Sequence, residues 1–159
     1  MKEIMDLLKE NAKITPEKIA RITGIPLKDV KKKINMMEKK GIIVKYKAVF
    51  NSNLYDDKKV LAVIDIKVTP ERGVGFDTIA RRINKFPEVK TLYLMSGGYD
   101  LLVMIEGDTL KEVASFVSEK LAPMVQVQST YTHFLLKKYK EDGDILTDDE
   151  KTKRLVVTP

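Results

Sequence analysis

The segment 14–43 constrains the fold more than any other part of this chain, because residues with special backbone preferences divide it into two short helices. Thr15-Pro16 is suited to begin a helix, since threonine caps the first free N–H groups and proline fits the first helical position. Gly24 supplies a stop at the end of that helix. Ile25-Pro26 then opens a second helix, which Gly41 ends. Two short helices joined by so tight a turn predict a helix-turn-helix.

The second of these helices is predicted to have two faces of opposite character. With an advance of about 100° per residue, its apolar side chains gather on one face. They are Leu27, Val30, Ile34 and Met37. The opposite face holds Lys28, Lys32, Asn35, Met36 and Lys39, with Lys31 on the flank. Lysine suits phosphates and guanine edges, and asparagine suits an adenine edge. The predicted DNA-contacting residues are Thr15, Lys28, Lys31, Lys32 and Asn35.

The distribution of charge supports this interpretation of the lysine-rich face. Such a face on a single helix is more often an ordinary solvated surface. Here, however, residues 1–47 carry 13 Lys+Arg and 6 Asp+Glu, a net charge of +7. The remaining 112 residues carry 16 and 17, a net charge of −1. The first part therefore calls for an anionic partner, double-stranded DNA, and the second part for a different task.

From residue 59 onward the apolar pattern changes to alternating strands with two helices between them. The predicted order is a strand at 59–69, a helix at 73–86, strands at 89–95 and 99–107, a helix from 108 and a long strand at 125–140. This β-α-β-β-α-β order is that of the ferredoxin-like unit. Glu112 is placed to complete a capping box on the second helix. The apolar face expected for that helix is Leu110, Val113, Val117 and Leu121.

These patterns predict an α+β chain with an N-terminal winged helix-turn-helix domain at 1–47 and a ferredoxin-like domain at 59–140. Residues 42–50 have a strand-like pattern that suits either a wing or a connecting strand, and a linker strand is assigned to 48–58. Residues 141–159 form a polar tail ending in a possible short strand. The strand at 59–69 is apolar in both phases, so a second copy of the chain is expected to cover one sheet face.

Composition excludes several functional classes. The chain has no cysteine and one histidine, His133, so disulfides, thiolate chemistry and a multi-histidine metal site within one chain are excluded. No apolar run approaches the roughly 18–20 residues that cross a bilayer, and the start lacks a signal-peptide pattern. We therefore expect a cytoplasmic protein without membrane, metal or cofactor. No phosphate-binding loop, catalytic carboxylate pair or nucleophile-base pair stands out, so no enzymatic activity is predicted.

Four motifs in the right order resemble the Lrp/AsnC family of transcription regulators. The first is the recognition-helix pattern from Ile25 to Ile43, although Pro26 stands where the family usually has Ser or Thr, and Lys33 where it usually has Arg. The others are Pro87-Glu88-Val89, the turn Ser96-Gly97-Gly98-Tyr99-Asp100 and the pair Thr130-x-Thr132. The resemblance covers about residues 2–140.

The resemblance implies a regulator that dimerises through its second domain, with further assembly into tetramers or octamers. It also implies a small-molecule effector, commonly an amino acid, bound near the Gly-x-Tyr-Asp turn. The carboxylate of Asp100 suits an α-ammonium, and the glycines allow close approach to backbone N–H groups. From the residues alone an ordinary hairpin turn is favoured, and the resemblance brings the ligand-binding turn to equal standing. The predicted effector-binding residues are Gly97, Gly98, Tyr99, Asp100, Gln128, Thr130 and Thr132.

Two other functions fit the same architecture. One is a tetrapyrrole-binding enzyme of the sirohaem decarboxylase type, in which His133 and Arg81-Arg82 would take part in the chemistry. The other is an architectural DNA binder without sequence preference. The basic first domain favours the regulator over the enzyme, and competition between a short defined site and bulk DNA separates the regulator from the architectural protein.

Overall fold

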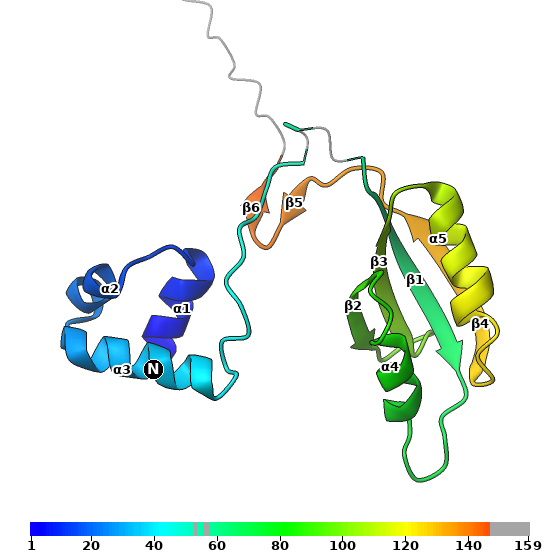
Figure 1. Ribbon diagram of the computed structural model, residues 1–159, viewed down its shortest axis with the longest axis horizontal. Helices are drawn as coiled ribbons and strands as arrows, with labels where there is room; N and C mark the ends of the chain where they lie inside the picture. Colours follow the sequence, from blue (N-terminus) through cyan, green and yellow to red (C-terminus); the bar gives the residue numbers. More distant parts are fainter. Residues whose placement is uncertain (53, 56–57, 147–159) are drawn as a thin grey trace, which may run out of the picture. The chain divides into compact units, whose positions relative to one another are not determined.

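The computed structural model describes residues 1–52, 54–55 and 58–146, and it divides the chain into two compact units at residues 50 and 51 (Figure 1). The first unit consists of three helices, α1 (Lys2–Glu10), α2 (Pro16–Thr23) and α3 (Leu27–Lys39). Their apolar faces meet in a small core of fully buried side chains. The core residues are Ile4, Ile19, Val30 and Met37.

The predicted start and stop signals of the helix-turn-helix are confirmed. The Oγ1 atom of Thr15 accepts a hydrogen bond of 3.3 Å from the backbone N–H of Lys18, which caps α2. Gly24 ends the helix in the left-handed region, with φ of 70°, and its N–H donates to the carbonyl of Ala20. This conformation lets the chain turn at once into α3.

The strand expected after α3 is not found. None of the described residues between α3 and residue 60 lies in a strand, so the wing or connecting strand at 42–50 is a correction. The linker strand at 48–58 includes residues 53, 56 and 57, which lie outside the described residues, and it stays a prediction. Gly41, with φ of 67°, turns the chain back, and the N–H of Ile42 donates to the carbonyl of Met37. The hydroxyl of Tyr46 donates to Glu38 at 2.8 Å. A strand pattern gives a strand only when a neighbouring backbone pairs with it.

The second unit is a four-stranded antiparallel sheet with helices on one face (Figure 1). Its main elements are β1 (Val60–Val68), α4 (Asp77–Ile83), β2 (Val89–Leu94), β3 (Leu101–Gly107), α5 (Leu110–Phe116) and β4 (Val127–Phe134). The strand order β2-β3-β1-β4 agrees with the predicted ferredoxin-like topology. Alternate residues of β1 and β3 are buried against the two helices. The described part of the chain has no helix long and apolar enough to cross a membrane.

The sheet face away from the helices is also apolar but is covered by no helix of the described chain. Residues of β1 that alternate with the core positions are only half-buried. Cross-strand pairing places Val63 opposite Met104 and Asp65 opposite Leu102. We call this surface the open face. Its central side chains are Leu61, Val63, Asp65, Leu102 and Met104.

The second helix begins as predicted and then departs from the prediction. Thr109 accepts from the N–H of Glu112, whose carboxylate accepts from the N–H of Asp108, a capping-box arrangement. A π-helical turn, η1 (Val117–Leu121), follows α5 directly. The extra residue in this turn changes the helical phase. Leu110, the first residue of α5, is 58% exposed, whereas Phe116, which is not on the expected apolar face, is buried.

The last predicted strand is shorter than expected. β4 ends at Phe134 instead of continuing to 140. A small hairpin follows, made of β5 (Lys140–Glu141) and β6 (Asp144–Ile145). Its turn is Asp142-Gly143, with both φ angles positive, as two-residue hairpin turns require. The possible short strand in the tail lies outside the described residues.

Candidate DNA-contacting and effector sites

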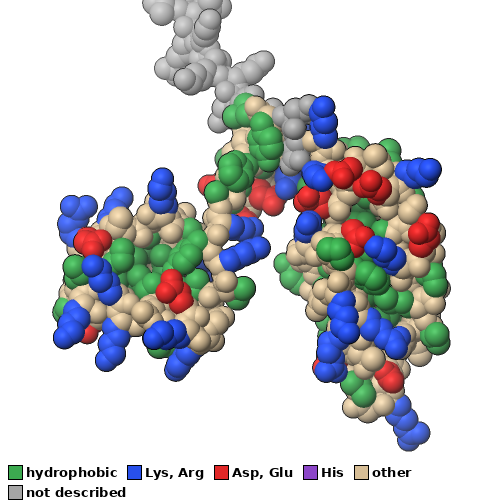
Figure 2. All heavy atoms as spheres, in the orientation of Figure 1, with side chains coloured by type: hydrophobic (Ala, Val, Ile, Leu, Met, Phe, Trp, Pro, Cys, Tyr) green, Lys and Arg blue, Asp and Glu red, His purple; other side chains and the backbone are tan. Residues whose placement is uncertain are grey.

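The outward face of α3 presents the basic surface that the helical periodicity predicts. Lys28, Lys32, Asn35 and Lys39 are exposed, and Met36 is half-buried among them. Figure 2 shows Lys and Arg side chains projecting from many points of the first unit. Part of this face forms a shallow hollow of about 590 Å³. The residues that line it are Lys31, Lys32, Asn35, Met36, Lys39 and Lys40. The surface therefore offers several ammonium groups along successive turns of one helix.

The lysines of this face differ in whether a carboxylate already holds them. The ammonium of Lys31 is 2.9 Å from a carboxylate oxygen of Glu17 on α2. The hydrogen bond from Lys31 is the main cause that lowers the pKa of Glu17 below its usual value. Lys28 and Lys32 have no ion-pair partner within the part of the chain that is described. They are therefore free to meet a phosphate, whereas Lys31 must first leave Glu17.

Thr15 contributes from the N-terminus of α2. Its hydroxyl oxygen is engaged as the cap, and a hydrogen bond from the same hydroxyl is among the causes that lower the pKa of Glu17. A hydroxyl at a helix N-terminus, where the backbone N–H groups also point outward, is well suited to a phosphate oxygen.

A backbone hydrogen bond joins the two ends of the turn between β2 and β3. The N–H of Met95 donates to the carbonyl of Asp100 at 2.8 Å. Gly97 has φ of 153°, whereas Gly98 has no positive φ. A Cβ atom at either glycine would meet no atom within 4 Å. Space for a ligand therefore exists beside this backbone.

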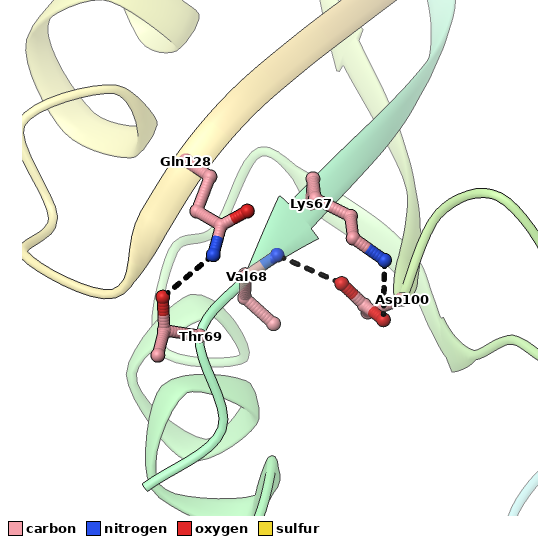
Figure 3. Close-up of polar contacts among 5 residues, drawn as sticks. All are labelled: Lys67, Val68, Thr69, Asp100 and Gln128. Carbon is pink, nitrogen blue, oxygen red and sulfur yellow. Dashed lines mark hydrogen bonds and ion pairs between the residues drawn. The ribbon is translucent and has the colours of Figure 1, made fainter.

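Asp100 fastens the turn to the end of β1 (Figure 3). One carboxylate oxygen accepts from the N–H of Val68 at 2.9 Å, and the other lies 3.3 Å from the ammonium of Lys67. The N–H of Asp100 donates to the carbonyl of Ile66. The Val68 hydrogen bond, followed by Lys67, lowers the pKa of Asp100, so the carboxylate is ionised. Both of its oxygens thus have partners inside the protein.

The remaining predicted effector residues lie on different sides of the sheet. Thr130 and Thr132 stand opposite buried residues of β1 and so point to the helix face. Tyr99 instead packs on Tyr131, which alternates with those threonines, at 5.4 Å between ring centroids. Gln128 donates to the hydroxyl of Thr69 at 2.8 Å (Figure 3). One chain therefore does not bring all seven predicted residues to a single pocket.

Sequence reasoning missed the inner partners of the turn. Lys67, Val68 and Thr69 carry no motif of their own, and only the register of β1 brings them to Asp100 and Gln128. On the open face, His133 lies 3.2 Å from Asp65. Strand alternation assigns each of these residues to one face of its own strand. It does not show that β1 pairs with β4, which is what brings the two side chains together.

Comparison with known proteins gives matches over both units. Residues 61–145 match the Lrp/AsnC ligand binding domain, and residues 1–44 match the winged helix-turn-helix DNA-binding family. YugG, an uncharacterised HTH-type transcriptional regulator of Bacillus subtilis (strain 168), is 48% identical over 158 residues, which are 99% of this chain and 95% of that protein.

Two solved structures show the same fold at low identity. A transcriptional regulator of Neisseria meningitidis in complex with L-Met has a TM-score of 0.68 and 21% identity, over 87% of this chain and 89% of that chain. AsnC of E. coli has a TM-score of 0.66 and 19% identity, over 91% and 95% of the two chains.

Proposed function

This chain belongs to the Lrp/AsnC family of transcription regulators, and on that premise we propose which side chains meet DNA, what the chain senses and how it assembles. The chain is a DNA-binding transcription regulator with a ligand-binding second domain, and not an enzyme. The family predicted from the motifs is confirmed. Nothing in the comparisons supports the tetrapyrrole-binding alternative. The cytoplasmic location remains part of the proposal.

The DNA contacts belong to the outward face of α3. The observation that carries this assignment is the exposed row of lysines on the recognition helix α3, two of them without a carboxylate partner in the described chain. Lys28 and Lys32 meet phosphates or guanine edges, and Asn35 reads an adenine edge. Thr15 contacts a phosphate. Lys31 joins them when it exchanges Glu17 for DNA.

Selection of bound fragments from the source genome tests the DNA assignment. The operator found in this way is then titrated with the Lys28→Ala and Lys32→Ala variants. The control is Lys111→Ala, at an exposed position of α5. Each α3 variant should lower the salt slope of binding by about one unit, and removal of a base-reading side chain should also relax specificity by about 1–3 kcal/mol. If both α3 variants bind like the wild type, the assignment is wrong.

The effector we propose is a free amino acid, bound beside the β2–β3 turn. The related structure with L-Met supports a ligand of this class. Backbone N–H groups near Gly97 and Gly98 suit its carboxylate, and the unused lone pairs of Asp100 suit its ammonium. Tyr99, Gln128, Thr130 and Thr132 supply neutral hydrogen bonds. Because these groups lie on two sides of one sheet, residues from more than one copy are needed to complete the site.

Calorimetry of the full chain against a panel of the twenty amino acids tests the sensor. We expect one or a few of them to bind and to change the affinity for the selected operator. A chain that binds its operator normally but none of the panel would overturn the amino-acid effector and leave the DNA assignment intact.

The assembly we propose is a homodimer that covers the open face, with tetramers or octamers formed from it. Half-buried apolar side chains in the middle of this face support it, since a monomer would leave them against water. A two-fold dimer also sets two recognition helices at a fixed separation.

A further inference from the structure

Charge is segregated within the second unit as well as between the two units. Residues 72–90 carry 5 Lys+Arg and 2 Asp+Glu, a net charge of +3. Residues 91–146 carry 5 and 8, a net charge of −3. The excess of positive charge in this nearly neutral unit therefore lies on α4 and its flanks. The basic residues of this segment are Arg72, Arg81, Arg82, Lys85 and Lys90.

Arg81 and Arg82 lie on the last turn of α4, and Lys85 follows in the turn just after the helix ends at Ile83. Ile79 and Ile83 are buried in the core, so the opposite side of the helix faces solvent. Arg81, Arg82 and Lys85 are all exposed there. Spacings of three and four residues make Lys85 a neighbour of both arginines on one helical turn. Figure 2 shows Lys and Arg side chains around the position of α4.

This cluster is not neutralised by carboxylates of the described chain. Arg81 donates from Nε to the backbone carbonyl of Asp77 at 3.2 Å, which leaves its other N–H groups available. Arg82 and Lys85 have no ion-pair partner among the residues described. Of the two carboxylates nearby in sequence, Glu88 is already paired with Lys120, and Asp77 forms no ion pair with the cluster among the residues described. Like charges so close together repel one another until an anion binds them.

We propose that the outward face of α4 is a second DNA-contacting surface, which binds phosphates of the duplex flanking the site read by α3. The inference rests on the proposed function. Guanidinium groups bind phosphate oxygens through paired hydrogen bonds, and such contacts do not depend on sequence. A duplex already held by α3 is present at high effective concentration, which favours it over a free acidic protein as the occupant.

The reach of the chain and the proposed dimer are both compatible with this surface. Gly41, just after α3, and Lys59, just before β1, are 18 residues apart, which allows at most about 60 Å of extended chain between these two elements. This is nearly two helical turns of duplex, at about 34 Å each. A dimer formed through the open face leaves the helix face of each sheet outward. Two copies of the cluster then face solvent, one for each flank of a palindromic site.

Full-length protein bound to two random-sequence duplexes tests the proposal. A duplex of about 20 base pairs spans two half-sites one turn apart, and one of about 60 base pairs adds flanking phosphates on both sides. The test variant is Arg81→Gln, Arg82→Gln and Lys85→Gln combined. The matched control removes the same charge elsewhere on this unit, with Lys111→Gln, Lys137→Gln and Lys140→Gln combined. Circular dichroism establishes that both fold.

We expect the α4 variant to bind the short duplex within about twofold of the wild type and the long duplex at least about tenfold more weakly. Its salt slope on the long duplex should fall by about 0.9 for each phosphate that the variant no longer neutralises. Unchanged binding to the long duplex, or an equal loss on both duplexes or in the control, would overturn the proposal. Failure of the proposed function would show separately, as short-duplex binding that is unaffected by Lys28→Ala with Lys32→Ala.

Discussion

At the scale of single residues, one ion pair decides which lysines of α3 are ready for DNA. Glu17 holds Lys31 at 2.9 Å and also places a negative charge beside the surface that we propose for DNA contact. We expect Glu17→Gln to strengthen DNA binding, because it frees Lys31 and removes that repulsion. The salt slope should become steeper by about 0.9 if Lys31 gains a phosphate.

Fluorescence anisotropy of a labelled duplex across a salt series measures both effects. Glu119→Gln, at an exposed glutamate on the π-helical turn of the second unit, is the control for the change in net charge. Equal behaviour of the two variants would show that Lys31 takes no part in binding.

Asp100 provides a second prediction at this scale, on stability against pH. Its folded-state pKa lies below 3.8, its ordinary value, mainly because the N–H of Val68 binds the carboxylate. The stabilisation is therefore complete above pH 3.8 and is lost as the pH falls through the lower folded-state pKa. Asp100→Asn should cost about 1 kcal/mol at pH 7 and show a weaker loss of stability below pH 3.8.

Urea denaturation of the full chain at pH 7 and pH 3 measures this difference. Asp144→Asn in the β5–β6 hairpin should leave both values unchanged, since that side chain is exposed. If the Asp100→Asn variant loses as much stability at pH 3 as the wild type does, groups other than Asp100 cause that loss.

At the scale of elements, the sequence predicted what local signals determine and missed what pairing determines. Thr15, Gly24 and Glu112 act through backbone groups a few residues away, so their roles could be inferred from spacing. The end of β4 and the absence of a strand at 42–50 depend on which backbone lies alongside. The effector residues followed the same rule. The turn at 96–100 was identified, but its inner partners on β1 were not.

Gly24 allows the contribution of backbone conformation to be measured alone. A Cβ there meets no atom within 4 Å, so Gly24→Ala adds only the cost of φ at 70°. That cost should be about 1–2 kcal/mol in the free energy of unfolding. Gly98→Ala is the matched control, because its Cβ also enters open space while its φ is not positive. Equal stability of the two variants in urea denaturation would contradict the role assigned to Gly24.

At the scale of the whole molecule, the two units divide the work by the chemistry of their surfaces. The first unit is strongly basic and has a small core, whereas the second has an apolar sheet with one face under helices and one face open. Association of two copies would bury the open apolar face of the second unit. The same association would bring two copies of the first unit, and so two recognition helices, into one assembly. Two half-sites about 34 Å apart bind two linked recognition helices far better than one.

Leu102→Asp in the full chain separates assembly from folding. Leu102 lies on β3 in the middle of the open face, opposite Asp65 of β1 and Tyr93 of β2. In the monomer a new carboxylate there stays in contact with water, but in the dimer it would be buried beside Asp65 without a cation of its own. Sedimentation at micromolar concentration should therefore show a dimer or larger assembly for the wild type and a folded monomer for the variant. Val125→Asp, at a position 94% exposed, should sediment like the wild type.

The DNA affinity of the same variants then shows what the dimer is for. The Leu102→Asp monomer should bind a palindromic operator weakly but retain its affinity for a single half-site, because its α3 is untouched. Its salt slope on the palindrome should fall to that of one recognition helix, since only one of the two half-sites is then neutralised. A Leu102→Asp variant that remains a dimer would place the interface elsewhere on the molecule. A monomer that binds the palindrome as tightly as the wild type would instead separate DNA recognition from assembly through this face.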